Sequence, residues 1–138
     1  MGNERYQVLL VEDSEDDRDV CTHFLSIRGF RVATAVSGRE GLEKAVQLQP
    51  DVILLDLWLP EIGGWEAAKR LKADERAKHI PIIIITGHSY IQADVLSSEG
   101  LLVKPCLPND LEDEILRVLQ TRRSSAAEQP KPDQASAA

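Results

Sequence analysis

The chain has 138 residues, with 16 basic side chains against 23 acidic ones and a formal net charge of −7. This length predicts one domain. An acidic chain without a Lys/Arg cluster binds phosphate backbones poorly, so we expect no direct contact with nucleic acid. No apolar run approaches the roughly 18 residues of a membrane span, so we expect no membrane insertion. The two cysteines, Cys21 and Cys106, are too few for a disulfide framework and predict buried thiols in a reducing cytoplasm.

Short apolar runs alternate with amphipathic stretches over residues 6–120. In chain order, the predicted elements are a strand at 8–11, a helix at 15–28, a strand at 31–35, a helix from Ser37 to Pro50, a strand at 52–55, a helix around 65–71, a strand at 82–85, a weak helix around 90–96, a strand at 101–103 and a last helix opened by Asn109 and Glu112. Continuous apolar strands that alternate with helices predict an α/β fold, a doubly wound parallel sheet with helices on both faces.

Helix ends are marked by particular residues. Gly29 follows the first helix, where a C-terminal cap is expected, and Ser37 with Glu40 three residues later is typical of a capping box. Residues 124–138 contain no Val, Ile, Leu, Met or aromatic side chain, so they cannot bury a core. We therefore expect a domain over residues 1–123 and a disordered tail or linker over 124–138. No further domain is recognisable after Arg123, which leaves open a stand-alone protein or a piece of a larger one.

Polar side chains follow four of the predicted strands. Glu12 and Asp13 come after the first, Asp56 after the third, Thr86 after the fourth and Lys104 after the fifth. Ligands of doubly wound sheets bind at the carboxyl ends of the strands, so we expect these groups to converge. Three carboxylates repel one another unless a cation lies among them, and oxygen ligands that leave room for water suit Mg²⁺. A carboxylate beside Mg²⁺, a lysine and a hydroxyl is typical of an aspartyl-phosphate acceptor.

Each of these features also has a plain structural interpretation. Taken singly, Glu12 and Asp13 fit a solvated loop, and Asp56 fits a turn. The acids that follow, Glu15, Asp16 and Asp17, are expected only to charge the first turn of a helix, where negative side chains are favourable. The joint placement on successive strand ends favours the chemical interpretation.

Four motifs in order resemble the receiver domain of bacterial two-component response regulators, of which the chemotaxis regulator is one. They are Val11-Glu12-Asp13, Leu54-Leu55-Asp56 with Leu59-Pro60 and Gly63-Gly64, Thr86-Gly87, and Lys104-Pro105. The resemblance covers roughly residues 6–120. It implies a flavodoxin-like three-layer sandwich around a five-stranded sheet of order 2-1-3-4-5.

The resemblance also implies residue roles. Asp56 is expected to be the phosphoacceptor. Glu12 and Asp13 are expected to bind Mg²⁺, directly or through water, together with Asp56 and the main-chain carbonyl of Trp58. Trp58 and His88 correspond to positions at the mouth of the site that influence the lifetime of the phosphoryl group.

Three further residues carry roles through the same resemblance. Thr86 corresponds to the switch hydroxyl that turns toward the phosphoryl group, and Lys104 to its salt-bridge partner. The Lys104–Pro105 peptide bond is expected to be cis, as X–Pro bonds in tight turns can be.

Three departures from the family pattern are visible. Leu101 occupies the position of the usual aromatic residue three before the lysine, and Tyr90 is the only nearby substitute. Thr86 and Lys104 are several residues closer than usual, which predicts a short or irregular fourth helix. Cys106 stands where the family often has an aromatic residue.

The resemblance implies a cytoplasmic switch rather than an enzyme with a separate turnover reaction. Its phosphoryl donor is expected to be a sensor histidine kinase or a histidine phosphotransfer protein, and its output an unidentified downstream protein. An alternative is a receiver-like protein-binding module that works without phosphorylation. A Mg²⁺-dependent phosphohydrolase or flavin protein is disfavoured, because Asp56-Leu57-Trp58 lacks the second aspartate of the haloacid-dehalogenase pattern and no Gly-rich phosphate loop follows the first strand.

Overall fold

The computed structural model describes residues 2–87, 98–105 and 107–128, and within them the chain forms one sheet flanked by helices. A short 3-10 helix, Gly2–Arg5, precedes the first strand. The strands are β1 Gln7–Val11, β2 Arg31–Ala35, β3 Val52–Asp56, β4 Ile82–Thr86 and β5 Gly100–Val103. The α-helices are α1 Glu15–Ile27, α2 Gly38–Leu48, α3 Gly63–Ala73 and α4 Pro108–Glu128.

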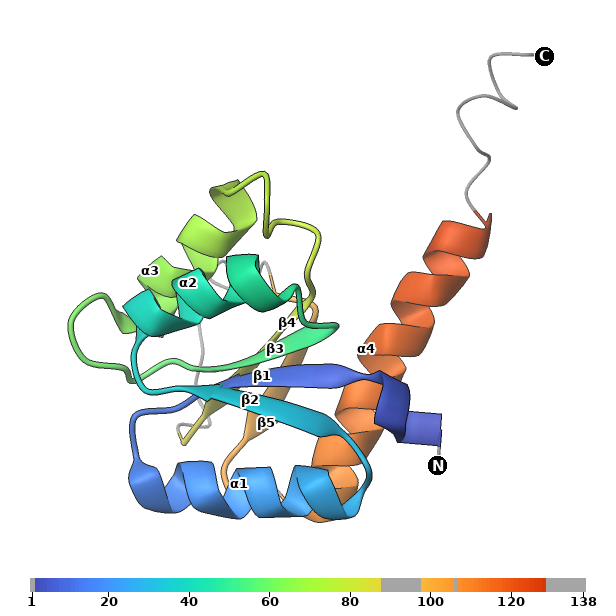
Figure 1. Ribbon diagram of the computed structural model, residues 1–138, viewed down its shortest axis with the longest axis horizontal. Helices are drawn as coiled ribbons and strands as arrows, with labels where there is room; N and C mark the ends of the chain where they lie inside the picture. Colours follow the sequence, from blue (N-terminus) through green and yellow to red (C-terminus); the bar gives the residue numbers. More distant parts are fainter. Residues whose placement is uncertain (1, 88–97, 106, 129–138) are drawn as a thin grey trace.

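All strand pairs are parallel, and the order across the sheet is β2-β1-β3-β4-β5. This confirms the predicted doubly wound topology. Helices α2 and α3 cover one face, whereas α1 and α4 cover the other (Figure 1). None of the helices in the described ranges is long and apolar enough to cross a membrane.

The two faces of the sheet explain why the strands are apolar without interruption. Successive side chains of a strand point to opposite faces. Leu9 and Ile53 pack into the core under α2 and α3, whereas Leu10 and Leu54 pack into the core under α1 and α4. Each of these four side chains is at most 1% exposed. The central strands are therefore fixed by burial on both sides.

The predicted end of the first helix is confirmed by its hydrogen bonds. Gly29 has a φ of 93°, in the left-handed region that glycine adopts without strain. The Phe30 N–H donates to the Leu25 carbonyl at 3.1 Å, and the Gly29 N–H donates to the Ser26 carbonyl at 3.0 Å. This pair of bonds is a Schellman motif, which turns the chain directly into β2.

The second helix begins at the predicted cap. Ser37 Oγ accepts a hydrogen bond from the Glu40 N–H at 3.1 Å, as a capping box requires. The Glu40 carboxylate accepts from the Val36 N–H at 2.8 Å, one residue before the cap.

The last helix differs from the prediction at both ends. It begins at Pro108, a favoured first helical residue, and not at an Asn109–Glu112 capping pair. Asn109 and Glu112 instead accept hydrogen bonds from Arg28, at 2.6 Å and 2.9 Å. The helix also continues past Arg123 to Glu128, because Ala and Glu favour helix even where no core is available. The predicted helix around 90–96, Cys106 and the tail residues 129–138 lie outside the described residues.

Candidate phosphoryl-acceptor site

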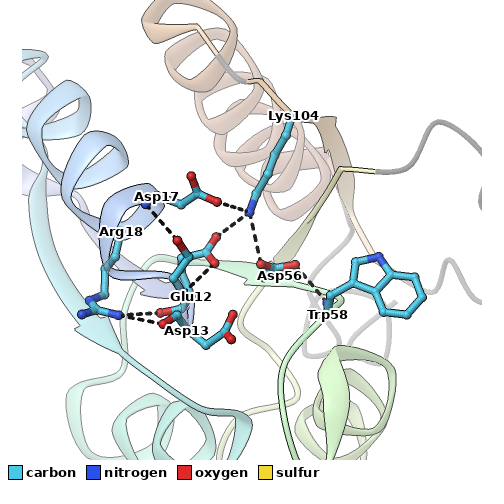
Figure 2. Close-up of polar contacts among 8 residues, drawn as sticks. Glu12, Asp13, Asp17, Arg18, Asp56, Trp58 and Lys104 are labelled. Atoms are coloured by element: carbon cyan, nitrogen blue, oxygen red, sulfur yellow. Dashed lines mark hydrogen bonds and ion pairs between the residues drawn. The ribbon is translucent and has the colours of Figure 1, made fainter.

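The carboxyl ends of four strands place the predicted site residues at one edge of the sheet. Glu12 follows β1, Asp56 and Thr86 end β3 and β4, and Lys104 follows β5. The parallel register pairs Asp56 with Ile85 and Thr86 with Val103, so neighbouring strands end at nearly the same level. Figure 2 shows the Lys104 side chain reaching down into the group of carboxylates.

The Lys104 ammonium forms ion pairs with three carboxylates at this edge of the sheet. Its Nζ lies 2.8 Å from Glu12 Oε1, 2.9 Å from Asp17 Oδ2 and 3.2 Å from Asp56 Oδ2 (Figure 2). These contacts join residues 48, 87 and 92 positions apart in the sequence. The predicted approach of Lys104 to the acidic residues is therefore present in the fold.

Asp17 is the site residue that sequence reasoning missed. The sequence predicts only that Asp17 adds negative charge to the first turn of α1, yet its side chain pairs with Lys104. The available signal was its position: α1 begins three residues after Glu12, so its first turn has to lie at the same edge of the sheet. Asp17 is held there because its backbone N–H donates to Ser14 Oγ at 3.3 Å.

Glu12 is a buried carboxyl with an unusual pKa. It is 1% exposed, and its Oε2 accepts a hydrogen bond from the Ser14 N–H at 3.1 Å. Burial raises the pKa of Glu12 to about 7; Lys104 opposes that shift, and Asp56 adds to it. Burial lowers the pKa of Lys104. The neighbouring carboxylates of Glu12, Asp17 and Asp56 have the larger effect together, so the pKa of the ammonium is raised. The lysine is thus charged across the physiological pH range.

The three acids predicted to bind a metal form one cluster. One carboxylate oxygen each from Glu12, Asp13 and Asp56 lie within 4.8 Å of one another. Asp13 is exposed while the other two are buried, so a cation bound here would keep access to water. The Arg18 guanidinium donates to the Glu12 main-chain carbonyl at 3.0 Å, which holds the loop that follows β1. An all-oxygen donor set with one open side fits Mg²⁺.

The loop after β3 orients the Asp56 carboxylate. The Trp58 N–H donates to Asp56 Oδ1 at 3.0 Å. Trp58 is 59% exposed, and its indole is directed away from the acids (Figure 2). Gly64 at the start of α3 donates its N–H to the Leu57 carbonyl at 3.0 Å. A Cβ at Gly64 would overlap the Asp56 carbonyl and lie 2.6 Å from the Leu57 Cα. Only glycine allows this close approach.

The strands beyond the acceptor place the expected switch residues. Thr86 is fully buried at the end of β4, and its carbonyl accepts from the Lys104 N–H at 2.7 Å. The Lys104–Pro105 peptide bond is cis. Leu101 lies on β5 and is 37% exposed, at the position of the usual aromatic residue. His88 and Tyr90 lie outside the described residues.

Comparison with known proteins shows the family to which the fold belongs. A family model for the response regulator receiver domain matches residues 8–116. The chain is 35% identical over 116 residues to the DNA-binding dual master transcriptional regulator RpaA of Synechocystis sp.. That alignment covers 81% of this chain and 47% of RpaA. It is 39% identical over 79 residues to the polar-differentiation response regulator DivK of Brucella abortus. That alignment covers 57% of this chain and 64% of DivK.

Comparison with solved structures supports the same family. The chemotaxis protein CheY4 of Vibrio cholerae superposes with a TM-score of 0.76 at 33% identity, over 82% of this chain and 98% of CheY4. The matches to RpaA and DivK each span less than two thirds of those proteins, whereas nearly all of CheY4 is matched. The matched region contains every site residue described above, and the chain belongs to the response regulator receiver domain family of bacterial two-component systems.

Proposed function

We propose that Asp56 accepts a phosphoryl group from a phosphohistidine of a sensor histidine kinase or a histidine phosphotransfer protein. Membership of the receiver family supports phosphoaccepting signalling. The observation that carries the assignment to Asp56 is its position, 4% exposed, with Oδ2 3.2 Å from Lys104 and in one cluster with Glu12 and Asp13. In the transfer, an Asp56 carboxylate oxygen bonds to phosphorus as the P–N bond breaks, and the imidazole nitrogen keeps the electron pair and takes a proton.

We propose that Glu12, Asp13, Asp56 and the main-chain carbonyl of Trp58 hold Mg²⁺. Bound there, Mg²⁺ supplies positive charge that offsets the charge on the transferring oxygens. Lys104 supplies a second positive charge beside Asp56, on a side chain already held by buried carboxylates. Positioning and charge compensation are the main contributions that a protein makes to phosphoryl transfer.

Thr86 and Lys104 are the proposed switch residues. Both connect to the loops after β4 and β5, and the bond from the Lys104 N–H to the Thr86 carbonyl links those two strand ends. A phosphoryl group that binds the lysine and the hydroxyl would bias the conformation of these loops and so the binding of a downstream protein. We propose no separate turnover reaction, a cytoplasmic location, and roles for Trp58 and His88 in setting the phosphoryl lifetime.

Trp58 provides a direct test because its backbone contacts Asp56. In a Trp65→Phe background Trp58 is the sole tryptophan. Addition of Mg²⁺ and beryllofluoride, a phosphoryl mimic, should change its fluorescence, and Asp56→Asn should abolish the change. Mass spectrometry after incubation with acetyl phosphate should find the adduct on Asp56. A folded protein that neither responds nor is modified would refute the proposal and favour the binding module without phosphorylation.

A further inference from the structure

The Lys104 ammonium is shared among three carboxylates, of which only two belong to the proposed acceptor and metal site. Glu12 and Asp56 are members of the acidic cluster, whereas Asp17 is not. The ammonium has three N–H donors, and the three partners lie at 2.8, 2.9 and 3.2 Å. The longest of these contacts is the one to Asp56, the proposed acceptor.

The three partners differ in their access to water. The side chains of Glu12 and Asp56 are 2% and 5% exposed, whereas that of Asp17 is 49% exposed. Loss of Lys104 would leave Glu12 as a buried carboxylate without its cation, which is costly. Water readily replaces the lysine at Asp17, because exposed ion pairs contribute little net stability. Asp17 is therefore the partner that Lys104 can leave most easily.

We propose that Asp17 is a positioning residue that holds Lys104 in the unphosphorylated protein and competes with the phosphoryl oxygens for its N–H donors. This inference rests on the proposed function of Asp56. A phosphoryl group on Asp56 brings new charged acceptors to the lysine, and Lys104 turns toward them by giving up Asp17 while it keeps Glu12. Asp17 thus lowers the affinity of the site for a phosphoryl group and limits the phosphorylated population.

Open space borders the ion pair on its α1 side, so water can take the place of the lysine at Asp17. A cavity of about 310 Å³ borders the ion pair and is lined by Asp17, Val20, Cys21, Gly87, Lys104 and Pro105. Asp17 itself cannot follow the ammonium far, because its backbone N–H is bonded to the Ser14 cap of α1. The contact between them is therefore expected to break rather than to travel with the lysine.

The test compares Asp17→Asn with Asp16→Asn. Both changes remove one negative charge from the first turn of α1, but Asp16 is exposed and only Asp17 pairs with Lys104. Beryllofluoride is titrated at saturating Mg²⁺ and followed by Trp58 fluorescence, with folding checked by thermal melting. We expect Asp17→Asn to tighten mimic binding about two- to five-fold, the range of an exposed ion pair. Asp16→Asn should change it by less than about 1.5-fold, because salt screens distant surface charges.

A crystal structure of the wild-type protein with Mg²⁺ and beryllofluoride gives a second, independent measurement. We expect the distance from Lys104 Nζ to the Asp17 carboxylate to exceed about 4 Å, the limit of an ion pair. An intact Lys104–Asp17 pair in that complex would overturn the inference, as would equal effects of the two substitutions or weaker binding by Asp17→Asn. A wild-type protein that does not respond to the mimic would instead refute the proposed function, and the inference with it.

Discussion

The raised pKa of Glu12 predicts that Mg²⁺ binding depends on pH in the neutral range. The residue Glu12 is 1% exposed, and burial raises the pKa of its carboxyl to about 7. A protonated carboxyl cannot offer a charged oxygen to a cation, so the bound metal and the proton compete for Glu12. The affinity for Mg²⁺ should therefore fall as the pH falls.

The magnitude follows from the fraction of Glu12 that is deprotonated. With a pKa of about 7, competition from the proton weakens binding by a factor of about 1.1 at pH 8, about 2 at pH 7 and about 11 at pH 6. The apparent dissociation constant should thus rise about tenfold between pH 8 and pH 6. A carboxyl with the ordinary value of 4.5 would give almost no change over that range.

The assay is a Mg²⁺ titration at pH 6, 7 and 8 and constant ionic strength, followed by Trp58 fluorescence in the Trp65→Phe background. Glu12→Gln is the matched control, since it keeps the shape of the side chain and an oxygen for Lys104 but cannot titrate. We expect weaker binding by this variant and the loss of most of the pH dependence. A flat profile in the parent protein, or an equally steep one in Glu12→Gln, would refute the reasoning.

Three further predictions concern stability and the geometry of the acceptor. Gly64→Ala should destabilise the fold by about 1–3 kcal/mol and slow phosphorylation of Asp56, because the new Cβ overlaps the acceptor loop. Gly87→Ala, where a Cβ meets no atom of the described residues within 4 Å, is the steric control in denaturant unfolding and acetyl phosphate assays. Asp56→Asn should lower the pKa of Glu12 in the metal-free protein, because it removes a carboxylate that raises it; an unchanged Glu12 pKa in an NMR titration would contradict this. Without Mg²⁺, the contribution of Glu12 to stability is fully present below about pH 4.5 and is lost as the pH rises through about 7. The free energy of unfolding should fall by up to about 3 kcal/mol over that range. Chemical denaturation at several pH values should find a smaller fall in Glu12→Gln.

Hydrophobic patterning along the chain is enough to predict the sheet and the convergence of polar residues at its edge. Unbroken runs such as 52–55 and 82–85 have to be buried on both faces, and parallel strands end at a common edge. That rule places Glu12, Asp56 and Lys104 at one edge of the sheet from the sequence alone. Local signals also located helix ends correctly where the cap bonds lie within a few residues, as at Gly29 and Ser37.

The pairing of charged groups depends on how the folded chain brings distant residues together. Asp17 resembled an ordinary first-turn acid until the fold brought Lys104, 87 residues away, within 2.9 Å of it. The spacing of Asn109 and Glu112 is typical of a helix cap, but in the folded protein both side chains accept hydrogen bonds from Arg28. A long charged side chain can reach several partners, and the choice depends on burial and distance, which no local pattern encodes. For the same reason the pKa of Glu12 is a property of its enclosure in the folded protein and not of its place in the sequence.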